Sequence, residues 1–179
     1  EQGMRVVHVE DYFNPTAGYQ INELLRASRG LGHEVFLVTS SDLSPFHIMF
    51  NEHNDNSFQE ETGVRIIRLP VKFKIASRVV MKSFWKTIDD LNPDLLYMHG
   101  IGDFKDLFLF MRRNYLTVRD CHMSWVASRN RFSGIYRHMY RRVFAPRINT
   151  GKKYKRVFAL GTEEKQYLVQ MGINSNMIS

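Results

Sequence analysis

Polar residues that can hold a ligand follow an apolar run in the second half of the chain. Arg119, Asp120 and His122 come directly after residues 116–118. Ligands of parallel sheets collect at the carboxyl ends of the strands. Asp120 can accept a hydrogen bond from a hydroxyl, and His122 can donate one to a hydroxyl or a phosphate. We therefore predict Asp120 and His122 as catalytic residues; the alternative is that Asp120 pairs with Arg119 or another neighbour and caps the loop.

Two other loops at predicted strand ends contain glycine. His99 and Gly100 follow the fourth predicted strand, and Ala17 and Gly18 close the loop after the first. Glycine permits a close approach of the backbone to a ligand. Only one glycine stands in the loop 11–18, so the G-x-G-x-x-G fingerprint of NAD or FAD binding is absent. Ordinary turns would also explain both loops, with His99 packed or exposed and without a chemical role.

The hydrophobic pattern predicts strands that alternate with helices, which favours an α/β fold with a mainly parallel sheet and helices on both faces. The expected strands are Arg5–Val9, Val35–Thr39, Val64–Leu69, Leu95–His99, Leu116–Arg119 and Arg156–Leu160. The expected helices are Tyr19–Leu31, Ile75–Leu91, Phe104–Asn114, Ser133–Ala145 and Glu163–Met171. The polar stretch Ser41–Gly63 is predicted as a long loop, mobile or functional.

The basic residues are unevenly distributed. The formal net charge is +7, yet residues 129–156 contain ten Lys or Arg and no acidic residue. Arg141 and Arg142 belong to this block. Arg78, Lys82 and Lys86 recur every four residues in the expected helix 75–91, beside Phe84 and Trp85. A solvated crossover helix explains this pattern, and so does an interfacial helix on anionic lipids. We predict these five basic residues as an anion or membrane surface.

Length and composition favour one globular domain. The chain has 179 residues, of which 44% are hydrophobic, and no apolar run approaches the roughly 20 residues that span a bilayer. Its single cysteine, Cys121, excludes an internal disulfide and favours a cytoplasmic location. We expect Cys121 to be a small buried residue rather than a nucleophile. No Cys/His spacing predicts a metal site. Glu1–Gly3 are expected to be an addition in front of a native start at Met4.

The sequence motifs near both ends of the chain resemble those of a known family. Residues 4–40 combine an opening strand, the Ala17-Gly18 turn, a helix and the phrase Leu31-Gly32-His33-Glu34-Val35. Residues 156–179 combine a strand, a helix that starts at Thr162 with Glu163 and Glu164, and a G-I-x-x-x-x-I tail from Gly172 to Ile178. The chain is similar in both stretches to the N-terminal domain of family 4 glycosyltransferases. These enzymes have the GT-B fold, in which two Rossmann-like domains face each other across a cleft.

The resemblance implies a retaining transfer of a sugar from a nucleotide-sugar donor, without an essential metal or other cofactor. The acceptor would be a saccharide or a lipid-linked molecule. Residues 4–179 would form the acceptor-side domain, and a C-terminal donor-binding domain would be absent, so this chain alone would be inactive. Ala17, Gly18, His99, Gly100 and Arg119 would contact substrate or donor. In the family the strand before Asp120 often ends in a His-Asp pair; Arg119 stands in place of that histidine.

Two other classes of protein remain as alternatives. One is a stand-alone basic module that binds nucleic acid or another polyanion, although no nucleic-acid motif is present. The glycosyltransferase interpretation expects no nucleic acid as a partner. The other is a receiver- or flavodoxin-like domain, for which Glu10 and Asp11 after the first strand are the only matching residues. Salt-dependent binding of arbitrary oligonucleotides would favour the first alternative. Binding to acidic vesicles without binding to oligonucleotides would favour the glycosyltransferase, which we expect to be cytoplasmic and peripherally bound to the inner face of the membrane.

Overall fold

A computed structural model describes residues 3–46, 48–75, 77–110, 115–122, 133–152 and 154–179. The chain divides into two compact units, Glu1–Tyr97 and Met98–Ser179, and each is described by itself. Six strands form one sheet in the order β3-β2-β1-β6-β7-β8. The strand pairs β1–β2, β2–β3 and β7–β8 are parallel. The predicted α/β architecture is therefore confirmed. No helix in the described residues is long and apolar enough to cross a membrane.

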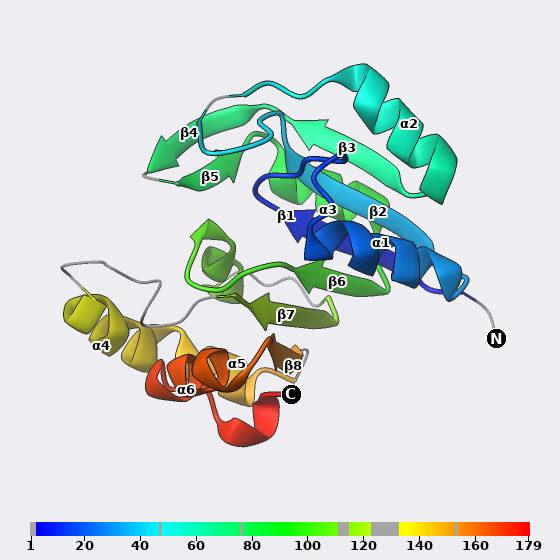
Figure 1. Cartoon of the computed structure of the whole chain (residues 1–179). Helices are drawn as coiled ribbons and strands as arrows, with labels where there is room; N and C mark the ends of the chain where they lie inside the picture. The colour runs from blue at the N-terminus through cyan, green and yellow to red at the C-terminus, as the bar shows by residue number, and fades with distance from the viewer. Residues whose placement is uncertain (1–2, 47, 76, 111–114, 123–132, 153) are drawn as a thin grey trace. The chain divides into compact units, whose positions relative to one another are not determined.

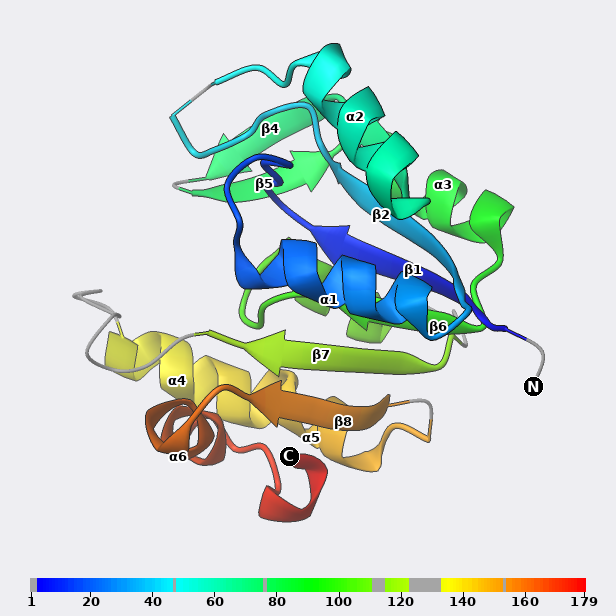
Figure 2. The same ribbon diagram turned by 45° about the vertical axis from the view of Figure 1, so that its right-hand side comes forward.

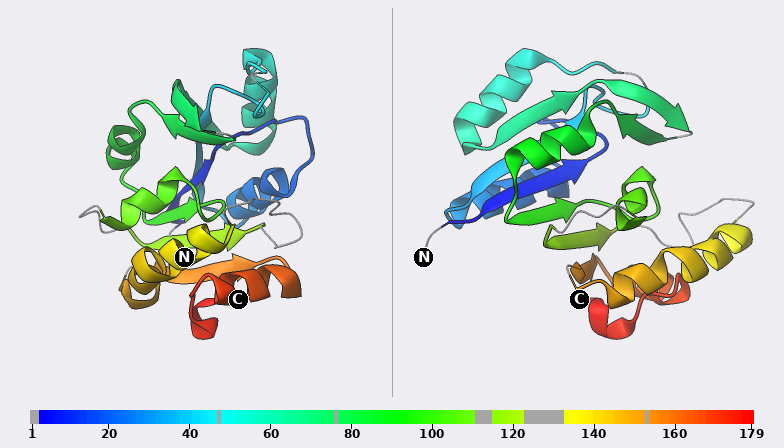
Figure 3. Two further views of the ribbon diagram at one scale, coloured as in Figure 1. Left: turned by 90° about the vertical axis from the view of Figure 1, so that its left-hand side faces the viewer. Right: turned by 180° about the vertical axis from the view of Figure 1, so that it is seen from behind.

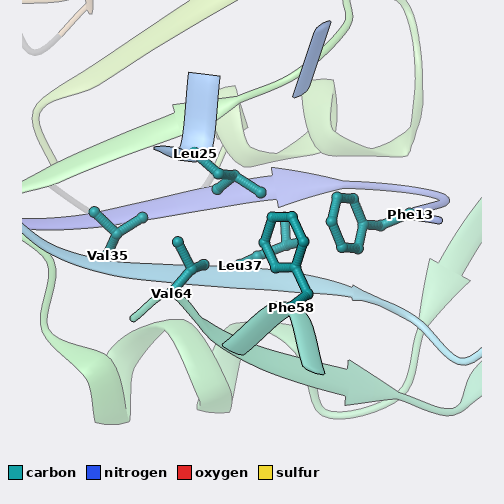
Figure 4. Packing of buried hydrophobic residues seen from close by; sticks show 6 residues of the cluster. All are labelled: Phe13, Leu25, Val35, Leu37, Phe58 and Val64. Carbon is teal, nitrogen blue, oxygen red and sulfur yellow. The ribbon is translucent and has the colours of Figure 1, made fainter. Parts of the chain in front are cut away.

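The first unit is built on three parallel strands, β1 (Arg5–Glu10), β2 (Glu34–Ser40) and β3 (Arg65–Leu69). Helices α1 (Gln20–Gly30) and α2 (Glu52–Thr62) supply Leu25 and Phe58 to a hydrophobic cluster with β2 (Figure 4). Helix α1 lies in front of β1 in Figure 1. In the right panel of Figure 3, where the molecule is seen from behind, α3 (Phe84–Leu91) lies in front of β1 instead. These helices cover the two faces of β1, which explains why its four central residues, His8 included, are all buried.

Two expectations for the first unit are wrong. The stretch Ser41–Gly63 is not a long loop, because it contains α2. Asn51 caps this helix by accepting a hydrogen bond from the His53 amide at 2.9 Å, and Gly63 ends it with φ of 73°. The polar composition hid a helix that has only two buried residues, Asp55 and Phe58. The capping signals were present in the sequence and could have located both of its ends.

The predicted helix Ile75–Leu91 is also wrong in its first half. An antiparallel hairpin of β4 (Val71–Ile75) and β5 (Arg78–Met81) precedes α3. Two adjacent β-branched residues, Val79 and Val80, favour the strand over the helix. Arg78, Lys82 and Lys86 therefore do not share a helical face: they lie in β5, in the turn and in α3, respectively. The interfacial helix that rested on their spacing does not exist.

The second unit contains the end of β6 (Leu95–Met98), then β7 (Thr117–Cys121) and β8 (Tyr154–Ala159), which lie side by side in Figure 2. Its helices are the 3-10 helix η1 (Phe104–Phe110), α4 (Ser133–Val143), α5 (Ala145–Thr150), α6 (Thr162–Gln170) and the short η2 (Ser175–Met177). Helix α4 lies behind β7 and β8 in Figure 2 and in front of β8 in the right panel of Figure 3.

The helix boundaries of the second unit refine the predictions. Pro146 lies in the first turn of α5, which follows directly on α4. The strand expected at Arg156–Leu160 is β8, which begins two residues earlier, at Tyr154. Helix α6 is capped by Gly161, and the Thr162 hydroxyl makes no capping hydrogen bond. Residues 111–114, the end of the helix predicted from Phe104, lie outside the described residues.

Candidate functional site

The ends of β6 and β7 bring two of the predicted polar residues together in the second unit. His99 directly follows β6, one of the two strands at which the strand order reverses, and Asp120 lies near the end of β7. Ligands of open α/β sheets bind at the carboxyl ends of strands near such a reversal. Both side chains are buried, with total exposures of 3% for His99 and 5% for Asp120. A buried polar pair at a strand end is the starting point of the candidate site.

The Asp120 carboxylate accepts hydrogen bonds from both sides. Its Oδ2 lies 2.5 Å from Nδ1 of His99, and its Oδ1 accepts the Gly100 amide at 2.8 Å. Nε2 of His122 lies 3.3 Å from the same Oδ1. Asp120 therefore binds the turn after the neighbouring strand. Asp120 does not pair with Arg119; its described partners are the two histidines, one of them its neighbour His122, and the Gly100 amide, so the alternative of a neighbour pair that caps the loop stays open.

The carboxylate is held in its charged form. Burial disfavours the ionised form, but hydrogen bonds from His122 and His99, the charge of His99 and the Gly100 amide outweigh it and lower the pKa of Asp120 well below its usual range. An ionised carboxylate can only accept hydrogen bonds, so Nδ1 of His99 carries the proton. In the neutral ring Nε2 is then the acceptor, and in the protonated ring it is a second donor. The pair thus fixes the orientation of the imidazole.

His122 differs from His99 in its exposure. Its side chain is 44% exposed, whereas that of His99 is 2% exposed. His122 can therefore contact a ligand from solvent, while the interaction of its Nε2 with Asp120 restrains the ring. Cys121 between them is a buried free thiol, as expected.

Arg119 points to the other side of β7 and is fully buried. Its Nε and Nη2 donate to the carbonyl oxygen of Gly100 at 2.9 and 2.6 Å. Its Nη1 forms an ion pair with Asp106. Burial by itself would lower the pKa of Arg119, but nearby carboxylates, led by Asp106, outweigh burial and raise it well above the usual value. The guanidinium therefore holds the backbone of the Gly100 turn.

Three charged residues that the sequence did not single out complete this network. Asp106 accepts the Gly102 amide at 2.7 Å, and Lys105 Nζ lies 2.6 Å from Asp103 Oδ2. Asp103 also lies 3.5 Å from Nη2 of Arg119. The signal that could have found them is the run Asp103, Lys105, Asp106 directly after a glycine turn at a strand end. These residues clamp the turn that follows His99 from the side opposite Asp120.

The described donors that could hold a metal ion are His99, Asp120 and His122, whose ligand atoms lie within 4.8 Å of one another. The His99–Asp120 contact of 2.5 Å is a hydrogen bond. Two atoms bound to the same ion at about 2.1 Å each would lie farther apart, at roughly 3 Å. The geometry present is that of a hydrogen-bonded dyad and its neighbour.

The predicted Asp11–Gly18 loop belongs to the first unit. Gly18 has φ of 62°, and a Cβ added there would meet nothing within 4 Å, so the backbone angle alone accounts for glycine. Asn22, which the sequence reasoning missed, is buried and donates to the carbonyl oxygens of Asn14 and Pro15 at 3.2 and 3.0 Å. Asn22 thus fixes the loop before Ala17. The N-terminus of α1 has no side-chain cap.

The predicted basic residues lie in different places. In the first unit Arg78 is half-buried, Lys82 is exposed, and exposed Lys86 pairs with Asp90 at 2.5 Å. In the second unit an open hollow of about 630 Å³ lies along α4; it is lined by Gly134, Arg137, His138, Arg141 and Arg142. None of the described residues that line this hollow is acidic. The α4 surface is therefore strongly basic and open.

The chain can also be compared with known proteins in sequence, in structure and by family. In sequence, no curated protein matches the chain. In structure, it is similar to a glycosyltransferase from Rickettsia africae ESF-5, with a TM-score of 0.58 and 13% identity, over 100% of this chain and 42% of that one. The likeness confirms the fold, and the chain spans less than half the length of that protein. A family model described as a glycosyl transferase 4-like domain matches residues 16–178, and the chain therefore belongs to that family.

Proposed function

We propose that this chain is the acceptor-side, N-terminal domain of a longer glycosyltransferase. The complete enzyme would move a sugar from a nucleotide-sugar donor to a saccharide or lipid-linked acceptor, with retention of configuration and without an essential metal. Family membership supports the transfer chemistry. The coverage of 42% of the matched glycosyltransferase supports a second, donor-binding domain. The observation that carries the assignment of the site is the buried His99–Asp120 pair at the carboxyl ends of β6 and β7.

The pair suits a reaction in which charge develops on the reacting sugar and on the leaving phosphate. Asp120, held ionised, fixes the orientation of the buried imidazole of His99 in the turn after β6. His122 contributes a second, more exposed imidazole to the same site. Groups that are already oriented need no reorganisation during the reaction, which is the main source of electrostatic stabilisation of a transition state. We assign contact with substrate to the exposed His122, and orientation to Asp120 and the buried His99.

Arg119 has a positioning role in this proposal. A fully buried guanidinium that is occupied by the Gly100 carbonyl and Asp106 cannot at the same time bind a donor phosphate. It fixes the backbone on which His99 stands. Gly100 adopts φ of 86°, which other residues rarely tolerate, so the turn can pass close to a ligand.

Ala17 and Gly18 are proposed to approach the donor phosphates in the complete enzyme. They precede the uncapped N-terminus of α1, whose free amides and dipole favour a negative charge. Asn22 keeps the preceding loop in place by its hydrogen bonds to Asn14 and Pro15.

Kinetics of variants in the complete two-domain protein test this proposal. Asp120→Asn removes the charge that orients His99, and we expect kcat to fall about a hundredfold or more, the usual effect of losing a positioned polar group worth roughly 2 to 4 kcal/mol. His99→Ala should cost at least as much, and His122→Ala should raise KM if it binds the donor. Addition of EDTA should leave turnover unchanged.

Asp90→Asn is the matched control, because it makes the same chemical change at an exposed carboxylate on α3. It should leave kcat unchanged. Melting temperatures of all variants report folding separately. Near-normal turnover of a folded Asp120→Asn enzyme would remove the dyad from the mechanism.

The α4 hollow favours a second candidate function, the binding of a polyanion such as nucleic acid. Arg137, His138, Arg141 and Arg142 repeat along one side of the helix and line the same open space. Anisotropy titrations with a labelled arbitrary oligonucleotide would test it. Binding that weakens with salt and is lost in Arg141→Gln/Arg142→Gln would support the polyanion module; absence of binding at low salt would leave the glycosyltransferase domain alone.

The location of the enzyme is also proposed. The single buried thiol favours a reducing cytoplasm. A lipid-linked acceptor would bring the domain to the inner face of the membrane as a peripheral protein. Of the basic residues predicted for that contact, Arg78, Lys82 and Lys86 do not share a helical face, whereas Arg141 and Arg142 lie on α4 and line its open hollow.

A further inference from the structure

Helix α4 packs against the rest of the second unit along one of its sides (Figure 2). Tyr140 on this side is fully buried, and its ring centroid lies 5.1 Å from that of Phe144 and 5.9 Å from that of Tyr136. A Cβ added to Gly172 would lie 3.3 Å from Cα of Arg141, so the two backbones approach closely there. These contacts fix the rotation of α4 about its own axis, and they therefore also fix which side chains it turns to solvent.

The side of α4 that faces solvent carries an apolar strip. Ile135 and Met139 are 73% and 43% exposed. They are four residues apart, which places them on the same face of the helix in successive turns. A single exposed apolar residue is ordinary, but two on successive turns form a continuous strip.

A basic row lies directly beside the apolar strip. His138 and Arg142 follow Ile135 and Met139 by three residues each, and residues three apart are neighbours on a helix surface. His138, Arg141 and Arg142 are exposed and line the open hollow along α4. The exposed side of α4 therefore presents cations and aliphatic side chains next to each other, which is the pattern of a helix that lies on an anionic lipid surface.

The second unit as a whole carries a strong positive charge. Residues 98–179 contain fifteen Lys or Arg but only five Asp or Glu. Three of these acids have buried side chains in the network around the Gly100 turn, namely Asp103, Asp106 and Asp120. The other two, Glu163 and Glu164, lie in the first turn of α6. The summed charge of this unit therefore attracts an anionic surface from a distance, before any side chain makes contact.

We propose that α4 docks on an anionic membrane, with Ile135 and Met139 in the boundary between headgroups and acyl chains. Arg141 and Arg142 contact lipid phosphates, since an arginine stem can lie along apolar surface while its guanidinium reaches an anion. Nucleic acids gain affinity from cations and stacked aromatic side chains, so the aliphatic strip favours lipid as the partner. This inference rests on the membrane location proposed above and assigns it to one helix; it does not depend on glycosyl transfer.

Sedimentation with phosphatidylglycerol/phosphatidylcholine vesicles tests this surface in the full chain. Ile135→Ser/Met139→Ser should weaken binding about tenfold or more, through the lost apolar burial. Arg141→Gln/Arg142→Gln should weaken it about thirtyfold at low salt, on the basis of the usual contribution of each basic group.

Two matched controls change the first unit instead. Leu31→Ser removes an apolar side chain that is 76% exposed at the C-terminal end of α1, and Lys72→Gln/Lys82→Gln removes two exposed positive charges. Both should bind like the wild type. Loss of binding in Lys72→Gln/Lys82→Gln, with normal binding in Arg141→Gln/Arg142→Gln, would move the membrane contact to the first unit and overturn the assignment to α4.

Other outcomes separate this inference from glycosyl transfer and from other partners of α4. Asp120→Asn should bind vesicles like the wild type, because docking needs no turnover. Equal binding to neutral and anionic vesicles, or none to either, would overturn the docking surface and leave the transfer proposal standing. Oligonucleotide binding without vesicle binding would assign α4 to nucleic acid and contradict the inference. Vesicle binding by this chain that the two-domain protein lacks would show that the second domain covers α4, and would overturn it too.

A substitution that keeps the strip apolar provides an independent measurement. Ile135→Trp should give a blue-shifted emission and quenching by brominated lipids after subtraction of the wild-type signal. Leu31→Trp should show neither change. An unquenched Ile135→Trp in a vesicle-bound protein would show that α4 does not enter the membrane, and would overturn the inference.

Discussion

At the scale of single residues, Asp120 connects three groups that lie apart in the sequence. It accepts from His99 and the Gly100 amide across the sheet and from His122 two residues later. Arg119, one position earlier, grips the same turn from the opposite side of β7. Adjacent residues of a strand face opposite sides, so neighbours in sequence serve separate networks. One network orients the imidazoles, and the other holds the backbone that carries one of them.

The ionised Asp120 predicts a dependence of stability on pH. Its pKa in the folded protein is lowered, whereas an unfolded aspartate titrates near about 3.9. The carboxylate therefore stabilises the fold fully above about pH 5, and this contribution is lost as pH falls below roughly 4 toward the folded pKa. Urea unfolding of the wild type and Asp120→Asn across pH should show a constant difference above pH 5 and a smaller one below about pH 4. An unchanged difference down to about pH 2 would contradict the assignment of charge.

Removal of one partner from the buried Arg119–Asp106 pair should be strongly destabilising. Asp106→Asn leaves a buried guanidinium without its main counter-charge, and we expect a loss of about 3 to 5 kcal/mol in the free energy of unfolding. Glu61→Gln removes an exposed partner of the half-buried Arg26, which keeps its ion pair with Glu23, and should cost less than about 1 kcal/mol. Denaturant titrations measure both. In the double variant Arg119→Met/Asp106→Leu the loss should be smaller than the sum of the single losses; additive losses would show that the pair is not coupled.

At the scale of elements, the turn between β6 and η1 is the best-defined part of the candidate site. Gly100 and Gly102 have φ of 86° and 77°, and their amides donate to Asp120 and Asp106. A Cβ at Gly102 would overlap the hydroxyl of Tyr136 on α4 and lie 3.2 Å from its Cζ. The turn is thus fixed by backbone angle, by two carboxylates and by a neighbouring helix.

Two glycine substitutions separate backbone angle from packing. Gly18→Ala meets open space, so it should cost only the angular penalty of about 1 to 2 kcal/mol. Gly102→Ala should cost about 1 to 3 kcal/mol more, because the new methyl overlaps Tyr136. Thermal and urea unfolding measure both losses. Gly102→Ala/Tyr136→Phe should recover part of the extra loss, since the overlapping hydroxyl is gone; no recovery would place the strain elsewhere.

At the scale of the whole molecule, the chain matches less than half of a solved glycosyltransferase. One wall of a cleft buries too little of a ligand for tight binding, since ligand sites usually enclose most of the ligand surface. We therefore expect no transfer by the isolated chain and no micromolar binding of a sugar nucleotide.

Calorimetry with several sugar nucleotides checks this expectation, with the two-domain protein as the positive control. Saturable micromolar binding to the isolated chain would contradict the assignment of the donor site to another domain. Turnover by the isolated chain would contradict the proposal that it is incomplete.

The sequence by itself determined the six strands of the main sheet and the family. Each of the six sheet strands was predicted within a few residues, because a buried strand is a local apolar run of β-branched residues. The family could be recognised for a similar reason, since Ala17-Gly18 and Leu31–Val35 are each a short uninterrupted motif. The contiguous residues of such a turn can be recognised as a local pattern even where the remaining sequence differs.

Only the tertiary structure decided which residues meet and which periodicity holds. Residues 78–86 carry a four-residue basic repeat, yet pairing with Val71–Ile75 makes their first part a strand. Asp120 and His99 are 21 positions apart, and their contact depends on the order of the strands. Asp103 and Asp106 became partners of Arg119 only because the turn folds back over β7. Such contacts arise from the packing of distant segments, and no local pattern records them.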